Sequence, residues 1–510
     1  MNVQSKKQKK SLMQIVFSRT MLITILLAIN FLYLFSVIFD LFRFVPMLFG
    51  SVVVFTAAVE LWILNSSDDV DVKLTWAAVV AVLPLLGAVL YAFVHFNLGN
   101  RVSRNLTRSS IADSRPYLPQ QTADVPAELQ SIARYLNDHA YAPAYTNTDV
   151  TYYPVGEAMF ESLLRELEQA EEFIFMEYFL VSHGHMWDTI LEILTRKAAQ
   201  GVDVRFLYDG MNAFTNLPYN YPKQLQKLGI QCKMHAPVRP FISTHYNYRD
   251  HRKITVIDGH TAFTGGINLE DCYININSPY GHWKDTAVML KGDAAAGFTH
   301  LFLQMWNATE RERDFSPCLK KSADSSHSAG FVIPYGYNPA EREAVGERVY
   351  LNMINNARKS LFIMTPYLIP DEELLQALCF AAKRGVDTQL ILPAICDHIA
   401  TQSIARSHYQ KLIESGVKVY EYTPGFVHGK VFLCDDLHAV VGTVNLDYRS
   451  LRHHFECAAY LYDLPALREI GEDFRLTREE CHQMTLEEVR SFSRFSKIFA
   501  YLTKFLAPLL

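Results

Sequence analysis

The chain has 510 residues and a formal net charge of −5, and half of its residues are hydrophobic. That length allows roughly two to four domains with a substantial core, and the charge balance gives no indication of a nucleic-acid partner. The eight cysteines form no Cys-x-x-Cys pair, so the sequence indicates neither a zinc site nor a disulfide framework.

The first hundred residues predict a membrane anchor. Residues 1–20 are polar and rich in lysine, and three apolar stretches follow. Each is close to the roughly 20 residues that a membrane-spanning helix needs, and together they argue against a cleaved signal peptide. We therefore expect two to three transmembrane segments within residues 1–100, drawn from Met21–Phe39, Phe44–Leu64 and Leu74–Val94.

The positive charges at the two ends of this anchor leave its orientation open. Lysines precede the first stretch, and Arg101, Arg104 and Arg108 follow the third, so both ends favour the cytoplasmic side. Three crossings would separate them, which makes one segment within 21–64 a candidate for an interfacial or re-entrant position. The interpretation that we favour places the part of the chain that follows the anchor on the cytoplasmic side.

Beyond the anchor, the pattern predicts a connector over residues 101–150, with one short helix around Ala127–Ala140. Two similar α/β halves follow, 151–313 and 331–488, joined by a polar linker over 314–330. Helical periodicity predicts the helices Phe160–Ala170, Leu191–Gln200, Tyr350–Ala357 and Leu374–Lys383. Short apolar runs predict the strands Phe173–Leu180, Val202–Tyr208, Leu361–Met364 and Val386–Leu392.

Each half carries one copy of the pattern His-x-Lys-x4-Asp. The six residues are His251, Lys253, Asp258, His428, Lys430 and Asp435. Each copy enters an apolar run that reads as a strand, on which residues two apart point the same way. In both copies an asparagine follows 17 residues after the histidine, at Asn268 and Asn445. This duplication predicts one site assembled from two similar halves.

Two histidines that are each accompanied by a lysine suit phosphoryl transfer without a metal. One imidazole would attack phosphorus and form a covalent intermediate, while the other would protonate the leaving alkoxide. The lysines and asparagines would stabilise charge on the nonbridging oxygens. Asp285 and Glu456 lie at similar distances past the two motifs and are candidates to fix the histidine tautomers.

The C-terminal segment 489–510 is both basic and apolar. Its cationic residues alternate with aromatic and aliphatic residues at helical spacing. Such a helix either lies on an anionic membrane surface or packs against the catalytic domain, and the sequence leaves both interpretations open.

The paired motifs resemble those of the phospholipase D superfamily, and within it the chain is similar to the bacterial cardiolipin synthases. The similarity runs from about Leu74 to Leu510 and includes several further motifs besides the two already described. Among them are Leu207–Asp209, Asn247–Lys253, Thr365–Pro370, Gly425–His428, Gly442–Ser450 and Ala507–Leu510.

This resemblance implies two α/β halves related by a pseudo-twofold axis, preceded by transmembrane helices in the bacterial cell membrane. The implied reaction transfers a phosphatidyl group from one phosphatidylglycerol to another, giving cardiolipin and glycerol through a phosphohistidine, with no metal or nucleotide cofactor. His251 is expected as the nucleophile and His428 as the acid and then the base. Supporting roles fall to Lys253, Lys430, Asn268 and Asn445 at the phosphate, Asp285 and Glu456 at the histidines, and Asp258 and Asp435 as loop anchors.

The chain also departs from the pattern of this family. The stretch 1–43 is an addition, and the link between the later apolar segments is acidic. Gly429 stands where alanine is common and His454 where asparagine is common, and neither is expected to touch the catalytic set. No role is assigned to His245 or His453.

Three other residues keep two interpretations each. Tyr178 and Tyr367 occupy equivalent places in the two halves, where they would line a lipid entrance or belong to the core. Arg249 would contact a headgroup or form a structural ion pair.

Three rival functions remain. In a membrane-bound phospholipase D, water would replace the alcohol acceptor and phosphatidic acid would form. A tethered nuclease would use the same motifs but would need a basic groove with aromatic stacking. A lipid-binding scaffold without activity would tolerate loss of one motif, whereas all six motif residues are present. The sequence leaves the oligomeric state open.

Overall fold

The computed structural model describes residues 27–28, 30–31, 46–96, 101–118, 124–237, 248–319, 330–339, 341 and 343–507. The chain divides into two compact units, of which the first holds residues 1–101 with 239–246 and the second holds nearly all of the remainder. Most of the predicted segment Met21–Phe39 lies outside the described residues, as does most of the linker 314–330.

Over its described residues 46–96, the first unit forms the helices α3 (Pro46–Leu64), α4 (Val70–Val82) and α5 (Pro84–Phe96). The second predicted segment is therefore one helix, but the prediction of a single helix over Leu74–Val94 is wrong. Helix α4 ends at Val82, with Leu83 as its C-cap, because Pro84 has no backbone N–H and restricts the residue before it. Within the described part of the chain, no helix combines the length and the apolar character that a membrane crossing requires.

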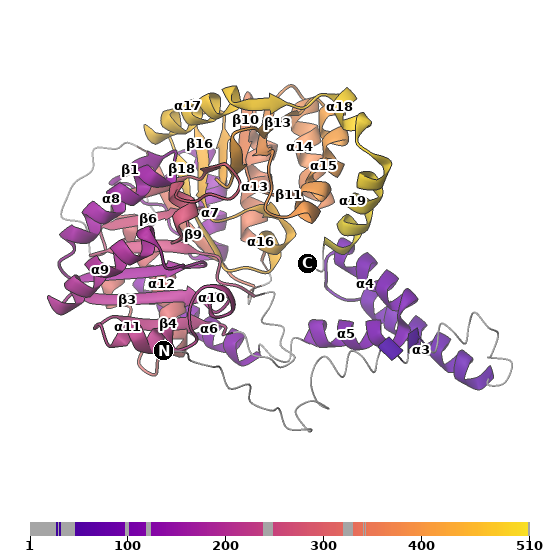
Figure 1. Cartoon of the computed structure of the whole chain (residues 1–510), viewed down its shortest axis with the longest axis horizontal. Coiled ribbons are helices and arrows are strands. Elements are labelled where there is room, and N and C mark those ends of the chain that lie inside the picture. The colour runs from indigo at the N-terminus through magenta and orange to yellow at the C-terminus, as the bar shows by residue number, and fades with distance from the viewer. Residues whose placement is uncertain are drawn as a thin grey trace, which may run out of the picture. The chain divides into compact units, whose positions relative to one another are not determined.

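Besides two short strand pairs, the described part of the second unit contains two large sheets built to one strand plan (Figure 1). In each, a parallel block of three strands continues into an antiparallel block of four. The first sheet has the order β1 (Thr148–Tyr153), β8 (Ala287–Gly292), β6 (Thr261–Gly265), β5 (Lys253–Ile257), β2 (Phe173–Tyr178), β3 (Asp203–Asp209), β4 (Gln231–His235).

The second sheet repeats this order and adds one edge strand. It runs β9 (Phe331–Tyr337), β18 (Glu456–Tyr462), β16 (His438–Gly442), β15 (Val431–Cys434), β10 (Ser360–Met364), β12 (Asp387–Pro393), β13 (Lys418–Tyr422), β19 (Cys481–Gln483). The prediction of two similar α/β halves is confirmed.

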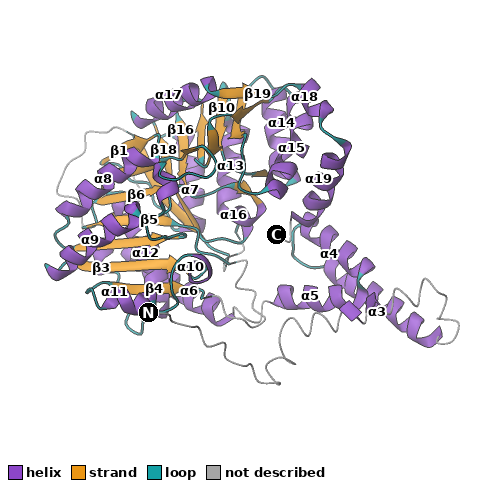
Figure 2. Ribbon diagram, in the orientation of Figure 1, coloured by secondary structure: helices purple, strands orange, loops and turns teal. Residues whose placement is uncertain are grey.

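Helices cover the outer face of each sheet (Figure 2). They are α8 (Gly156–Gln169), α9 (His185–Ala199), α11 (Tyr221–Gln226), α13 (Val345–Asn356), α14 (Glu372–Lys383) and α15 (Ile399–Glu414). Both α9 and α14 are followed by a glycine with a left-handed backbone, Gly201 at φ 95° and Gly385 at φ 94°. Only glycine adopts this conformation at no steric cost, so these positions end the helices in both halves.

The two halves share a continuous apolar core. Helix α12 (Ala295–Trp306) is buried along its whole length, and α17 (Ala466–Glu479) buries one face. Side chains of both helices pack together with residues of both sheets, including Phe175 and Val332. Burial of this much apolar surface fixes one half against the other, which the site described below requires.

The connector contributes to this unit as well. The short helix expected there is α7 (Ala127–Ala140), which packs through Leu129, Ile132 and Leu136 into the core of the second half. It is preceded by α6 (Arg101–Ser114). The remaining helices of the second unit are α10 (Asn212–Thr215), α16 (Tyr448–Arg452), α18 (Leu486–Ser491) and α19 (Arg494–Leu506).

Candidate active site

A short parallel pair of strands ties the second motif to the first half. Strand β14 (Gly425–Val427) pairs with β7 (His282–Lys284), and the backbone N–H of His428 donates to the carbonyl of Lys284 at 2.7 Å. Asp285 follows β7 directly, and its Oδ2 accepts a hydrogen bond from His428 Nδ1 at 2.6 Å. The carboxylate that orients the second histidine therefore comes from the first half.

The first motif has the same arrangement with the halves exchanged. Asp250 forms a parallel bridge with Phe455, and the backbone N–H of His251 donates to the carbonyl of Phe455 at 3.0 Å. The next residue is Glu456, whose Oε2 accepts a hydrogen bond from His251 Nδ1 at 3.0 Å. The sequence named both carboxylates as candidates, but it did not reveal that each serves the histidine of the other half.

Two hydroxyl groups hold the Glu456 carboxylate in place. Thr443 Oγ1 donates to Oε2, and Ser450 Oγ donates to Oε1. Burial opposes ionisation of Glu456, yet His251 and the hydrogen bonds that the carboxylate accepts hold its pKa below the usual range. Sequence reasoning gave these hydroxyls no role, although both lie in the motif Gly442–Ser450.

Burial also determines the charge of the two histidines. It lowers the pKa of His251 to about 3 and that of His428 to about 4, so both rings are neutral at neutral pH. A neutral ring whose Nδ1–H is donated to a carboxylate presents Nε2 as the base or nucleophile. Lys430 Nζ lies 3.0 Å from Nε2 of His428, whereas Nε2 of His251 has no hydrogen-bond partner among the described residues.

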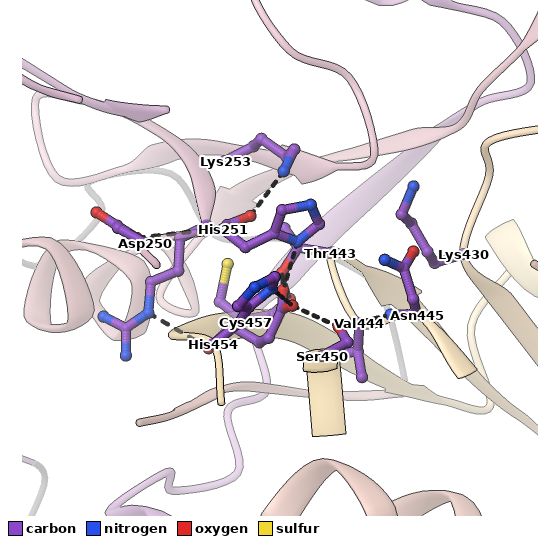
Figure 3. A network of polar contacts seen from close by, with 12 residues as sticks. Asp250, His251, Lys253, Lys430, Thr443, Val444, Asn445, Ser450, His454 and Cys457 are labelled. Atoms are coloured by element: carbon purple, nitrogen blue, oxygen red, sulfur yellow. Dashed lines mark hydrogen bonds and ion pairs between the residues drawn. The ribbon is translucent and has the colours of Figure 1, made fainter. Parts of the chain in front are cut away.

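The two lysines fold back onto their own motifs. Lys253 Nζ donates to the carbonyl of His251 at 2.7 Å, and Lys430 Nζ donates to the carbonyl of His428. Burial lowers the pKa of Lys253 to about 8 and that of Lys430 to about 7. Figure 3 shows both lysines and Asn445 around His251. An anionic phosphate between them would favour their charged forms.

The two asparagines differ in how their side chains are engaged. Asn268 Oδ1 accepts from the backbone N–H of Leu180 at 3.0 Å, and its Nδ2 donates to the hydroxyl of Tyr273 at 2.6 Å. Asn445 Oδ1 is buried without a hydrogen-bond partner in the described part of the chain. Asn445 is therefore the better placed of the two to meet a ligand.

The aspartates of the motifs lie away from the histidines. Asp258 follows β5 directly, at the opposite end of that strand from His251. Its carboxylate accepts three backbone N–H groups, from Glu171–Phe173, at 2.8 Å each. Asp435 accepts the equivalent three from Arg358–Ser360 at 2.7–2.9 Å. Both aspartates thus anchor a loop and leave proton transfer to other groups.

The expectation that position 454 does not touch the catalytic set is wrong. The ring centroids of His454 and His251 are 5.2 Å apart, and His454 Nδ1 lies 3.5 Å from Glu456 Oε1. The residue sits two positions before Glu456, where an extended chain points both side chains the same way. The two-residue spacing between His454 and Glu456 could therefore have indicated from the sequence that His454 lies at the site.

The structure also decides between interpretations that the sequence left open. Arg249 is buried and forms an ion pair with Asp209 at 3.3 Å, which favours the structural role. Tyr178 is buried in the core of the first half. Tyr367 is half-buried, and its hydroxyl donates to Asp397 at 2.5 Å.

Two groups of side chains among the described residues bring three potential metal ligands within 4.8 Å of one another. They are His251, His454 and Glu456, and Glu347, Asp371 and Glu373. In the first group Glu456 is bonded to His251, and in the second Arg452 lies 2.5 Å from Glu347 and 3.6 Å from Asp371. These protein partners already balance the carboxylate charge, so the geometry assigns neither group to a metal.

Comparison with known proteins agrees with this geometry. The family described as "Cardiolipin synthase, PLD-like domain" matches residues 163–306 and 350–477, one block in each half. A cardiolipin synthase of Halalkalibacterium halodurans is 32% identical over 86% of this chain and 88% of its own. An uncharacterised protein of Streptococcus mutans is 44% identical over 88% of this chain and 99% of its own.

A solved structure shares the fold. The crystal structure of phosphatidylserine synthase from Haemophilus influenzae matches with a TM-score of 0.56 and 15% identity, covering 75% of this chain and 98% of its own. At that identity the likeness concerns the fold alone.

Replacing either orienting carboxylate by its amide tests whether each half supplies the group that orients the histidine of the other half. We expect Glu456→Gln and Asp285→Asn each to lower kcat by about 100-fold, because an amide no longer fixes the Nδ1–H tautomer. His251→Ala and His428→Ala are each expected to lower kcat by at least about 10⁴-fold, since each ring performs a separate step. The measurement is steady-state turnover of phosphatidylglycerol by protein whose folding is checked by circular dichroism.

Asp258→Asn is the matched control for these variants, because it changes a motif carboxylate at the far end of the strand. It is expected to retain kcat within about twofold, as a substitution away from the reacting groups does. Wild-type kcat in Glu456→Gln or Asp285→Asn would contradict the assignment.

Proposed function

Because the chain belongs to the phospholipase D-like cardiolipin synthase family, we propose that it transfers a phosphatidyl group from one phosphatidylglycerol to a second, giving cardiolipin and glycerol. The observation that carries this proposal is the crossed pair of hydrogen bonds, His251 with Glu456 and His428 with Asp285. It places two oriented imidazoles in one buried site, as a two-step phosphoryl transfer needs.

In the first step His251 Nε2 attacks the phosphorus of the donor lipid, and the bond from phosphorus to the glycerol oxygen breaks. The proton for the leaving oxygen comes from His428, which becomes protonated when the anionic phosphodiester enters the site. Glu456 stabilises the positive charge that develops on His251. Lys253 and Lys430 face the nonbridging oxygens and stabilise their charge.

In the second step the terminal hydroxyl of another phosphatidylglycerol attacks the phosphohistidine. His428, now neutral, takes the hydroxyl proton, and the bond between phosphorus and His251 Nε2 breaks. His428 thereby regains the proton with which it began the first step, and His251 is free again. The proton that His428 takes from solvent as the lipid enters is released to solvent when the product leaves, so the cycle balances without an energy source. If water attacks at this step instead, the product is phosphatidic acid.

The reaction is tested with phosphatidylglycerol as the sole lipid. We expect purified protein in detergent or liposomes to form cardiolipin and glycerol in equal amounts, detected by mass spectrometry, because the chemistry uses only side chains of the protein. Addition of a chelator is expected to leave the rate unchanged. Phosphatidic acid as the main product would instead identify a hydrolase, and absence of any lipid turnover would overturn the proposal.

We further propose that the protein works at the bacterial cell membrane, with the catalytic part on the cytoplasmic side and anchored by the N-terminal segments. Helix α19 supports this proposal, because Phe495, Tyr501 and Leu502 are 80%, 68% and 63% exposed on it. The same helix carries Arg494, Lys497 and Lys504. Exposed apolar side chains together with cations are typical of a helix that lies on anionic lipid.

A triple variant tests the role of α19. We expect Phe495→Ser, Tyr501→Ser and Leu502→Ser together to raise KM for phosphatidylglycerol vesicles by about tenfold, because apolar contact with the bilayer is lost. kcat at saturating lipid is expected to stay unchanged. Leu476→Ser on α17 is the control, since Leu476 is also an exposed apolar residue. An unchanged KM in the triple variant would contradict the membrane role of α19.

A further inference from the structure

A third imidazole lies in the catalytic centre. His454 follows α16 and stands two residues before Glu456, the first residue of β18. Its side chain is buried, and its ring faces the ring of His251 at a centroid distance of 5.2 Å with 35° between the planes. Figure 3 shows the two rings next to each other in the polar network.

The surroundings of His454 do not give its ring nitrogens the hydrogen bonds that a purely structural role would require. Neither ring nitrogen has a hydrogen-bond partner among the described residues, although Nδ1 lies 3.5 Å from Glu456 Oε1. Burying two polar atoms without partners costs free energy that an apolar side chain of similar size would not incur. A role that only fills space is therefore a poor explanation of a histidine at this position.

One aromatic side chain links this ring to the nucleophile. The Phe179 ring lies 5.0 Å from the ring of His251 at 61°, and 6.5 Å from that of His454 at 33°. The His251 ring therefore has Phe179 and His454 as two neighbouring contacts, while its Nδ1 is held by Glu456. Loss of the His454 ring would leave space into which His251 could turn.

His454 also affects the pKa of His251. Burial is the main cause of the lowered pKa of His251, and the neighbouring His454 lowers it as well. The titratable and charged groups that face His454 come from the motif loop, α16 and β18. They are His251, Asp447, His453 and Glu456.

We propose that His454 is a positioning residue of the phosphatidyl transfer: it supports the Glu456 carboxylate and holds the His251 ring with Nε2 toward the lipid phosphate. The proposal rests on the function proposed above and adds a residue to it. Because His454 acts through Glu456 and His251, its loss affects the chemical step rather than the binding of lipid. It also affects the pH at which His251 becomes protonated and inactive.

Two variants distinguish the contact of His454 with Glu456 from the charge that an imidazole can carry. His454→Leu removes both, whereas His454→Asn keeps a donor near the position of Nδ1 but cannot carry a charge. We expect His454→Leu to lower kcat by about 10- to 100-fold with KM unchanged, as loss of a supporting residue does. His454→Asn is expected to recover most of kcat. In both variants the acidic limb of the kcat/KM profile is expected to move up by about 0.5 pH unit, because His454 is one of the groups that lower the pKa of His251.

His408→Asn on α15 is the control, because His408 is also a buried histidine with an unpartnered ring nitrogen among the described residues. Thermal unfolding of every full-length variant reports on folding. If His454→Leu fails to fold, the pH profile of His454→Asn still decides. Wild-type kcat in His454→Leu together with a wild-type pH profile in His454→Asn overturns the inference. Failure of the wild-type protein to turn over phosphatidylglycerol would overturn the proposed function instead, so the two failures are distinguishable.

Discussion

The catalytic geometry depends on two buried hydrogen bonds that cross between the halves, from His251 to Glu456 and from His428 to Asp285. Neither half contains a complete pair, and a buried carboxylate without its partner is costly. The halves must therefore be packed together before either histidine is oriented. The shared core around α12 and α17 provides that packing, and the short parallel strands β7 and β14 set the register.

The duplicated scaffold nevertheless gives two different histidines. Lys430 Nζ approaches Nε2 of His428 within 3.0 Å, whereas Lys253 bonds only to the carbonyl of His251 among the described residues. Nε2 of His251 thus has no hydrogen-bond partner among the described residues, whereas Lys430 Nζ lies 2.9 Å from Nδ1 and 3.0 Å from Nε2 of His428 and, in addition to burial, lowers the pKa of that ring. The unengaged Nε2 supports the proposal that His251 is the nucleophile, which leaves His428 as the acid and base. Symmetry between the motifs alone could not assign these roles.

Much of this architecture could be predicted from the sequence, because it follows from local sequence patterns. The repeated His-x-Lys-x4-Asp motifs, the strands beside them and the spacing of Asn268 and Asn445 all pointed to one site made from two halves. The exchange of Asp285 and Glu456 could not be predicted in this way, because it depends on two short backbone pairings between segments far apart in the chain, β7 with β14 and Asp250 with Phe455. Pro84 was visible in the sequence as a residue that interrupts helices. The prediction nevertheless treated Leu74–Val94 as one segment, because the residues around Pro84 are apolar.

The covalent intermediate tests the central claim most directly. Protein turning over phosphatidylglycerol labelled in its phosphate would be quenched under alkaline conditions, digested and examined by mass spectrometry for phosphatidyl-histidine. The account predicts a labelled adduct on the peptide that contains His251, formed and lost at the rate of turnover. An adduct on His428 would contradict the assignment of the nucleophile, and steady turnover without an adduct on either histidine would contradict the two-step mechanism.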